Sequence, residues 1–112
     1  MAKDLKNILL FDFYRNILPE KQAEIIDLYY NEDLSLSEIS EHLGITRQGV
    51  RDNIQRAERK MTSAEEDLAL AARYEKCRGL IAEIRKETGG ISEKDIAARI
   101  DKLLTEVENF GF

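Results

Sequence analysis

The sequence predicts an all-α protein in two parts, an N-terminal helical unit over residues 1–62 and a C-terminal antiparallel helical hairpin over residues 63–112. Apolar residues recur at helical spacing along most of the chain, and no segment shows the sustained alternation of a strand. One proline and six glycines among 112 residues leave little room for turns, which favours long helices. Two Ser-x-x-Glu patterns, which are typical of helix N-termini, support the same fold class.

The first helix is predicted over residues 4–17. Its apolar stripe is expected at helical spacing from Leu5, Ile8, Leu9, Asp12 and their neighbours, with Phe11, Phe13 and Tyr14 as extra aromatic residues. The aromatic cluster 11–14 (FDFY) is interpreted as core packing. A partner-binding patch and a platform for stacked RNA bases are the alternatives for this cluster.

The second helix is predicted over residues 19–30. Pro19 suits its first turn, because proline has no backbone N–H to leave unpaired there. The polar residues 31–33 (NED) end the helix. The residues expected to be buried are Ile25, Ile26, Leu28 and Tyr29.

A short third helix and a longer fourth helix follow. Residues 35–38 (SLSE) form the first capping box, and this helix is expected to end near Leu43. Gly44 can adopt the left-handed conformation that stops a helix sharply. Thr46 is expected to cap a fourth helix that runs to about Met61.

The C-terminal part is predicted to begin with a helix break or bend near Thr62. A fifth helix over residues 63–86 starts with the second capping box, SAEE. The turn at residues 88–90 (TGG) is the clearest in the chain. Ser92 is expected to cap a sixth helix over residues 93–109.

The last two helices carry matching apolar stripes, which predict that they pack as a hairpin. The surplus apolar residues Leu68, Leu80 and Leu104 must meet the first part of the chain or a second copy of it. The hairpin therefore either closes the core of a monomer or forms a homodimer. The stripes are Leu70, Tyr74, Cys77, Ile81 and Ile84, and Ile96, Ile100, Leu103, Val107 and Phe110.

Residues 34–61 fill every position that a helix-turn-helix requires. The first helix of that motif presents apolar residues inward and a small residue where the helices cross. A glycine makes the turn, and the second helix needs an inward apolar stripe. The inward residues are Leu36, Ile39, Leu43, Ile45, Val50, Ile54, Ala57 and Met61, with Ser40 as the small residue and Gly44 in the turn.

The outer face of the second helix carries side chains that suit DNA recognition. With Val50 inward, a helix of about 3.6 residues per turn places Gln48 and Arg51 on the outer side. Arginine pairs with guanine and glutamine with adenine in the major groove, and a helix N-terminus attracts phosphate. Arg47, Gln48, Arg51 and Gln55 are predicted to lie nearest the bases, and Thr46, Arg56 and Arg59 to contact phosphate.

The charge of the chain is unevenly distributed. The protein carries −5 at pH 7, but residues 46–62 hold five Lys or Arg against two Asp or Glu, a local +3. Residues 1–45 carry −5 and residues 63–112 carry −3. The candidate reading helix is therefore locally basic, and we expect weak, strongly salt-dependent binding to DNA.

Asp52 also faces outward, between Gln48 and Gln55. A carboxylate in this position could accept a hydrogen bond from cytosine N4. It could equally repel phosphate or meet a basic protein partner, and the sequence leaves these alternatives open.

The sequence predicts neither an enzyme nor a metal or cofactor site. His42 and Cys77 are alone of their kinds, without clustered carboxylates, and no Gly-rich phosphate loop occurs. The most apolar run, residues 8–14, is far shorter than the roughly 20 residues of a membrane span. No signal-peptide cleavage pattern follows it. We therefore expect a cytosolic protein without membrane insertion.

Residues 34–61 (LSLSEISEHLGITRQGVRDNIQRAERKM) resemble the fourth region of sigma factors, which reads a promoter element. More closely, the chain resembles the YlxM family of small bacterial helix-turn-helix proteins, most strongly over residues 5–62. The segments that carry this resemblance are 10–14 (LFDFY), 18–22 (LPEKQ), 28–30 (LYY), 33–39 (DLSLSEI) and 47–54 (RQGVRDNI).

The YlxM family is encoded beside components of the signal recognition particle. The resemblance therefore implies a DNA-binding regulatory protein with a role in the signal recognition particle pathway. The alternative is a helical adaptor that does not bind DNA and instead binds the protein or the RNA of that particle.

Overall fold

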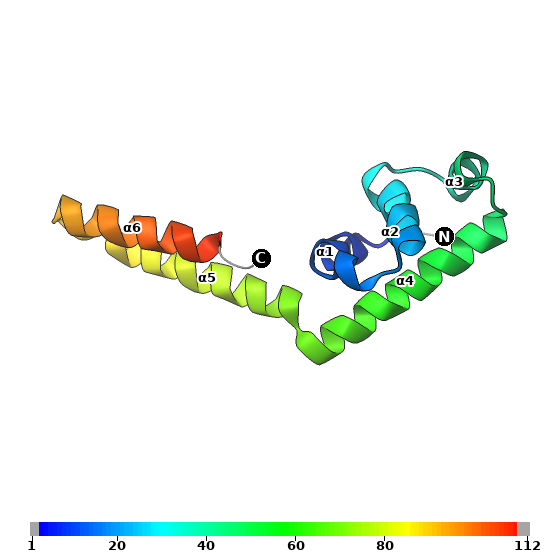
Figure 1. The fold of residues 1–112 in the computed structure, drawn as a ribbon. Helices are drawn as coiled ribbons and strands as arrows, with labels where there is room; N and C mark the ends of the chain where they lie inside the picture. The colour runs from blue at the N-terminus through cyan, green and yellow to red at the C-terminus, as the bar shows by residue number, and fades with distance from the viewer. Residues whose placement is uncertain (1–2, 110–112) are drawn as a thin grey trace. The chain divides into compact units, whose positions relative to one another are not determined.

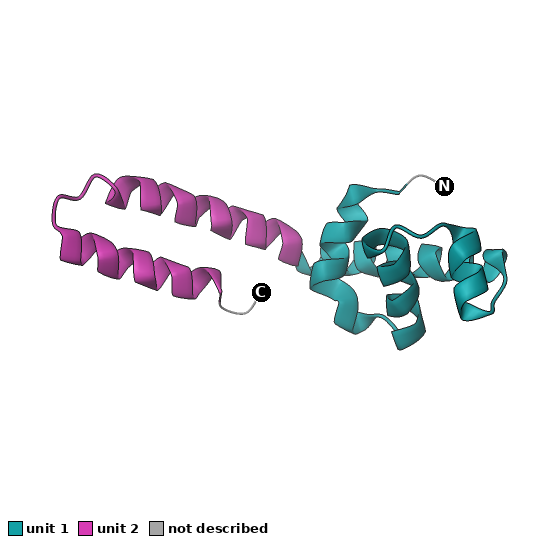
Figure 2. Ribbon diagram, turned by 90° about the horizontal axis from the view of Figure 1, so that it is seen from above, with its two compact units in different colours: residues 1–69 teal, residues 70–112 magenta. Residues whose placement is uncertain are grey.

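The computed structural model is entirely helical in its secondary structure across residues 3–109, the part of the chain that it describes (Figure 1). This confirms the predicted all-α fold class. The chain divides into two compact units, residues 1–69 and 70–112 (Figure 2). The helices are α1 (Leu5–Tyr14), α2 (Glu20–Ile26), α3 (Leu36–Leu43), α4 (Arg47–Leu68), α5 (Leu70–Thr88) and α6 (Lys94–Glu108), with a 3₁₀ turn at Arg15–Ile17 and a π-helical turn at Asp27–Asn31.

The first unit is organised around α4, which contacts α1, α2 and α3 (Figure 1). The inward residues of α4 are completely buried, at the helical spacing that the sequence predicted. They meet apolar and aromatic residues from the other helices of the unit. The buried residues of α4 are Val50, Ile54, Ala57 and Met61, and their partners in the core include Leu10, Phe11, Ile25, Ile26, Tyr29 and Ile39.

The buried face of α1 differs from the predicted one. Leu5 and Leu9 were expected to form the stripe, but their side chains are 76% and 55% exposed. The structure buries Phe11 and Tyr14, which confirms core packing for these two members of the aromatic cluster, because large aromatic rings remove more apolar surface from water than leucine does. Asn7 is buried on the same face and donates hydrogen bonds to Tyr30 and Glu58, which offset its burial.

The second predicted helix is present, but its geometry changes partway. Its α-helical part begins at Glu20, with Pro19 as the preceding N-cap residue, and the chain continues as a π-helical turn from Asp27 to Asn31. A π turn holds more residues than an α turn and so rotates the side chains that follow. Tyr29 and Tyr30 are consequently both buried, with their rings edge to face at 5.0 Å.

Lys3 holds the loop that leads into α3. Its ammonium group donates to the Tyr29 carbonyl at 2.7 Å, to the Leu34 carbonyl at 3.1 Å and to the Asp33 carboxylate at 2.8 Å. Asp33 has a left-handed backbone with φ of 54°. The bond from Lys3 lowers the pKa of Asp33, and these contacts tie the entry of α3 to the end of the π turn.

A break or a bend was predicted near Thr62, and the break is wrong. α4 continues to Leu68 and ends at Ala69, whose backbone is left-handed with φ of 53°. A Ser-x-x-Glu pattern caps a helix only where the preceding residues leave helical geometry, and the buried Met61 keeps the chain in α4. The two compact units divide after Ala69, whereas the sequence predicted a division after Thr62.

The second unit is a hairpin of α5 and α6 (Figure 2). Among its described residues, Ile81 and Leu104 are buried. The N-cap residue of α6 is Glu93 rather than the predicted Ser92, so the turn extends further than TGG alone implied. Phe110, the last residue of the predicted stripe, lies outside the described residues.

Candidate nucleic-acid interface

The capping box that opens α3 is formed as predicted. The Ser35 hydroxyl accepts from the Glu38 backbone N–H at 3.1 Å, and the Glu38 carboxylate accepts from the Ser35 backbone N–H at 3.0 Å. These bonds from Ser35 lower the pKa of Glu38, because they favour its ionised form. The start of α3 is therefore fixed by local chemistry.

The turn between α3 and α4 has the geometry of a helix-turn-helix. Gly44 is left-handed with φ of 68°, and its N–H donates to the Ser40 carbonyl at 3.0 Å. The Ile45 N–H donates to the same carbonyl at 3.2 Å. The Ser40 hydroxyl donates back to the Ile45 carbonyl at 2.5 Å. Ser40 is therefore more than the small residue that the motif requires, since its hydroxyl also closes the turn.

The cap of α4 is also formed as predicted. The Thr46 hydroxyl accepts from the Gly49 N–H at 2.9 Å, and the Thr46 carbonyl accepts from the Val50 N–H at 3.0 Å. A Cβ atom on Gly49 would lie 3.1 Å from the Thr46 hydroxyl oxygen, a tight contact. The first turn of α4 is thus packed closely around its own cap.

Packing between α3 and α4 is concentrated at the middle of the pair. Ile39, Val50 and Ile54 are fully buried. Leu36, Leu43 and Ile45, which the sequence placed inside, are only half-buried. The ends of α3 therefore remain partly open to solvent, while its centre holds α4 in place.

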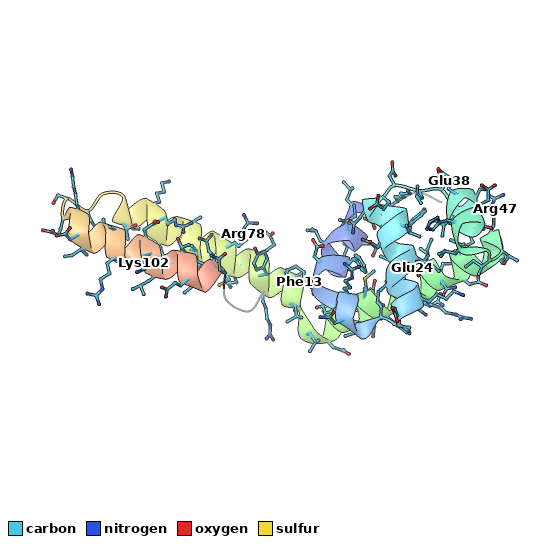
Figure 3. The ribbon with its side chains drawn as sticks, turned by 45° about the horizontal axis from the view of Figure 1, so that its top comes forward. Phe13, Glu24, Glu38, Arg47, Arg78 and Lys102 are labelled. Atoms are coloured by element: carbon cyan, nitrogen blue, oxygen red, sulfur yellow. The ribbon has the colours of Figure 1, made fainter. Side chains whose placement is uncertain are left out.

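All seven predicted site residues lie on the exposed surface of α4 or at its N-cap. Contacts with bases were predicted for the first turns of the helix, and contacts with phosphates for its start and middle. Figure 3 shows Arg47 near Glu38, at the end of the unit where α3 and α4 meet. The seven exposed residues are Thr46, Arg47, Gln48, Arg51, Gln55, Arg56 and Arg59.

Gln48 and Asp52 are paired on this surface. The Gln48 side-chain amide donates to the Asp52 carboxylate at 2.9 Å. An amide group has two N–H donors and a carbonyl acceptor, so this bond leaves one donor and the acceptor of Gln48 for a ligand. Asp52 is half-buried and thereby orients Gln48.

The middle of α4 carries a basic hollow that the site prediction only partly included. Three cations, Arg56, Arg59 and Lys60, and one carboxylate, Asp67, line an open hollow of about 490 Å³ together with Ile17, Ser63 and Ala64. Lys60 was counted among the basic residues of the helix but was not assigned to the site. Its proximity to Arg56, at four residues along a helix, was the signal that could have included it.

Residues 3–109, which the structure describes, hold neither a metal-binding cluster nor a membrane-spanning helix. No group of three or more His, Cys, Asp or Glu side chains is placed to hold a metal ion. No helix in this range is both long enough and apolar enough to cross a membrane.

Comparison with known proteins identifies the family. The model of the UPF0122 family, described as "Putative helix-turn-helix protein, YlxM / p13 like", matches residues 1–106. The chain belongs to the UPF0122 family. This confirms the resemblance to YlxM proteins that the sequence motifs indicated.

Relatives in the UPF0122 family align with most of the chain. The UPF0122 protein of Acetivibrio thermocellus is 41% identical over 108 residues, which cover 96% of this chain and 92% of the relative. A relative from a Thermoanaerobacter species is 41% identical over 99 residues, covering 88% and 85%. The relative from Shouchella clausii is 44% identical over 86 residues, covering 77% and 79%. Both units therefore belong to the part of the chain shared with the family.

Proposed function

We propose that this UPF0122 protein is a cytoplasmic DNA-binding regulatory protein without catalytic activity, which reads base edges with the first turns of α4. The observation that carries the proposal is the exposed row of Gln48, Arg51 and Gln55 on a helix whose opposite face is buried. A recognition helix must be held by its inner face while its outer face enters the major groove. α4 meets both requirements.

Each predicted contact has a chemical role in this proposal. Arg51 offers two N–H donors to guanine, and Gln48 and Gln55 each offer a donor and an acceptor to adenine. Asp52 orients Gln48 through its 2.9 Å hydrogen bond, which favours one presentation of the amide. Thr46 and Arg47 lie at the helix N-terminus, where a phosphate is favoured.

In the middle of α4, Lys60 joins the predicted phosphate contacts Arg56 and Arg59. Arg56 and Arg59 share their hollow with Lys60 and Asp67, so three cations and one carboxylate face one open region, with an excess of positive charge. Binding should fall as salt rises, since each phosphate contact releases counterions. With three such contacts, log affinity against log salt should have a slope of about −3, at about −0.9 per phosphate.

The proposal is tested by selecting DNA from a random pool with the full-length protein and then measuring affinity across a salt series. Gln48→Ala and Arg51→Ala should each weaken binding to the best sequence by about 1–3 kcal/mol and relax the choice of one base. Arg59→Ala should weaken binding to all sequences and reduce the salt slope by about 1.

Lys102→Ala provides the control, because Lys102 is an exposed cation of the second unit that no proposed contact includes. It should leave both affinity and sequence preference unchanged. The DNA-reading proposal fails if no sequence is enriched, or if Gln48→Ala and Arg51→Ala bind the best sequence as tightly as the unmodified protein.

A second candidate function is an adaptor that binds the protein or the RNA of the signal recognition particle. The observation that favours it is the acidic character of the first unit, which holds nine Lys or Arg against fourteen Asp or Glu. Asp52 adds a half-buried carboxylate to the outward face of α4. Such a surface suits a basic protein partner better than it suits a polyanion.

The adaptor is tested by titrating the purified protein and, separately, the purified RNA of the signal recognition particle with the full-length chain. Asp52→Asn should weaken binding to the protein component if a basic partner meets this surface. If the chain binds neither the protein nor the RNA of the particle, the adaptor is excluded. The DNA experiment then decides whether the DNA-reading proposal holds.

A further inference from the structure

The two faces of the α5–α6 hairpin differ in their chemistry. One face is tied together by Arg85, whose guanidinium donates to Asp101 at 3.0 Å and to Thr105 at 3.1 Å. The same guanidinium forms an ion pair with Glu108. On this polar face both carboxylates, Asp101 and Glu108, have the Arg85 guanidinium as a partner within the hairpin.

The opposite face is apolar and open to solvent in the monomer. Ile81 and Leu104 are the buried, inward-facing residues of the two helices, and Leu80 and Leu103 each lie one position before them. In an antiparallel hairpin, residues that lie the same number of positions before the inward residue of each helix project from the same side of the hairpin. The apolar face consists of Leu80, Ile84, Ile96, Leu103 and Val107, whose side chains are 43–54% exposed.

The hairpin by itself buries little apolar surface. Of its described residues, Ile81 and Leu104 are buried. Units of this size often rely on a disulfide, a metal or oligomerisation for stability. Cys77 is the only cysteine of the chain, so an internal disulfide is excluded.

The charges beside the apolar face are arranged in a self-complementary way. Arg73 and Lys76 lie in the first half of α5, and Glu83 and Glu87 lie in its second half. Arg73 and Glu87 are each seven residues from Leu80, while Lys76 and Glu83 are four and three residues away. All four are exposed, and none forms an ion pair within residues 3–109.

A twofold axis at Leu80 would place each of these cations opposite an anion. In an antiparallel pair of α5 helices, Arg73 of one copy meets Glu87 of the other, and Lys76 meets Glu83, with the reciprocal pairs also formed. On α6, Arg99 and Glu106 flank Leu103 in the same manner. The second unit holds eight Lys or Arg and eight Asp or Glu, so it carries no net charge to repel its own copy.

We propose that a second copy of this chain covers the apolar face, giving a twofold-symmetric antiparallel four-helix bundle centred on Leu80 and Leu103. Bundles of this kind bury apolar stripes between paired hairpins. The inference concerns the second unit alone and is independent of DNA binding.

The proposal is tested with two charge variants of the full-length chain. Glu83→Lys with Glu87→Lys makes the four rim positions 73, 76, 83 and 87 all basic, and Arg73→Glu with Lys76→Glu makes them all acidic. Lys86, which lies beside Glu83 and Glu87, is unchanged in both variants. Each variant alone should dimerise at least about tenfold more weakly than the unmodified protein, because like charges then face each other. A 1:1 mixture should restore a dimer, which sedimentation equilibrium would detect.

Several outcomes would overturn the proposal. These are an unmodified protein that stays monomeric at all concentrations, charge variants that dimerise normally, or a mixture that does not associate. Leu80→Asp should also weaken the dimer, with helical content checked by circular dichroism. Leu5→Asp changes an exposed leucine of the first unit and should have no effect. A dimer lost with Leu5→Asp but kept with Leu80→Asp would place the contact elsewhere.

Discussion

Gly49 lies in the first turn of α4, where its missing side chain has two opposite effects. Glycine costs about 1 kcal/mol relative to alanine within a helix. An added Cβ, however, would lie 3.1 Å from the Thr46 hydroxyl oxygen that caps the helix. That hydroxyl accepts from the Gly49 N–H itself, so the cap and the glycine depend on each other.

We expect Gly49→Ala to stabilise the protein less in the presence of Thr46 than in its absence. In a Thr46→Ala background the substitution should raise the free energy of unfolding by about 1 kcal/mol. In the unmodified protein part of that gain is offset, because the capping hydroxyl must move by a few tenths of an ångström. Urea denaturation of the four proteins in this cycle measures the difference, and equal gains in both backgrounds would contradict the explanation.

The end of α4 is the clearest case where one element departs from its sequence pattern. The helix passes through the second Ser-x-x-Glu pattern and stops at Ala69, whose N–H donates to the Glu65 carbonyl at 2.8 Å. Ala69 adopts a left-handed backbone with φ of 53°, which is strained for any residue with a Cβ. No glycine marks this helix end, so the usual sequence signal was absent.

Ala69→Gly should therefore raise the free energy of unfolding, by roughly 0.5–1 kcal/mol. Glycine removes the left-handed strain, and this gain exceeds its greater freedom in the unfolded chain. Ala64→Gly is the matched control, because Ala64 lies inside α4 with helical geometry, and it should lower stability by about 1 kcal/mol. Denaturant unfolding compares the two variants, and destabilisation by both would show that Ala69 is not strained.

At the scale of the whole molecule, a buried polar network joins three elements of the first unit. The Asn7 amide donates to the Tyr30 hydroxyl at 3.2 Å and to the Glu58 carboxylate at 2.9 Å. Burial raises the pKa of Tyr30 to about 12, with the Asn7 bond opposing and the nearby Glu58 charge adding to the shift. Burial also raises the pKa of Glu58, while its hydrogen bond to Tyr30 lowers it.

This network predicts a loss of stability in alkaline solution. Because the pKa of Tyr30 is higher in the folded chain than in the unfolded chain, its contribution is complete below pH 10.0 and is lost as pH rises through about 12. The unmodified protein should lose about 2–3 kcal/mol more than Tyr30→Phe over this range, at about 1.4 kcal/mol per pKa unit. Denaturant unfolding at several pH values measures this, and parallel losses in both proteins would contradict it.

The distribution of charge also belongs to the whole molecule. The first unit carries the whole excess of acidic residues, while residues 46–62 within it are basic and the second unit has no net charge. These regions suit different tasks in the two proposals, since a basic helix attracts phosphate and a neutral hairpin can pair with its own copy.

Much of the candidate site was accessible from the sequence because its determinants are local. The caps at Ser35 and Thr46 and the left-handed Gly44 each depend on residues within a few positions, and all three are formed. Burial of Val50 and Ile54 follows from helical periodicity. The pairing of Gln48 with Asp52 and the hollow beside Lys60 were missed, because side-chain conformation and the approach of Ile17 depend on the folded unit.

The sequence by itself determined the all-α class, the helix-turn-helix and the hairpin, since spacing of apolar residues and capping chemistry act over one or two helical turns. The tertiary structure alone decided which face of α1 is buried, where α4 ends and which apolar residues of the hairpin stay exposed. These features depend on competition among distant side chains for a limited core. Phe11 and Tyr14 are buried, as core packing of the aromatic cluster predicted, whereas Leu5 and Leu9 stay exposed, which helical spacing alone does not indicate.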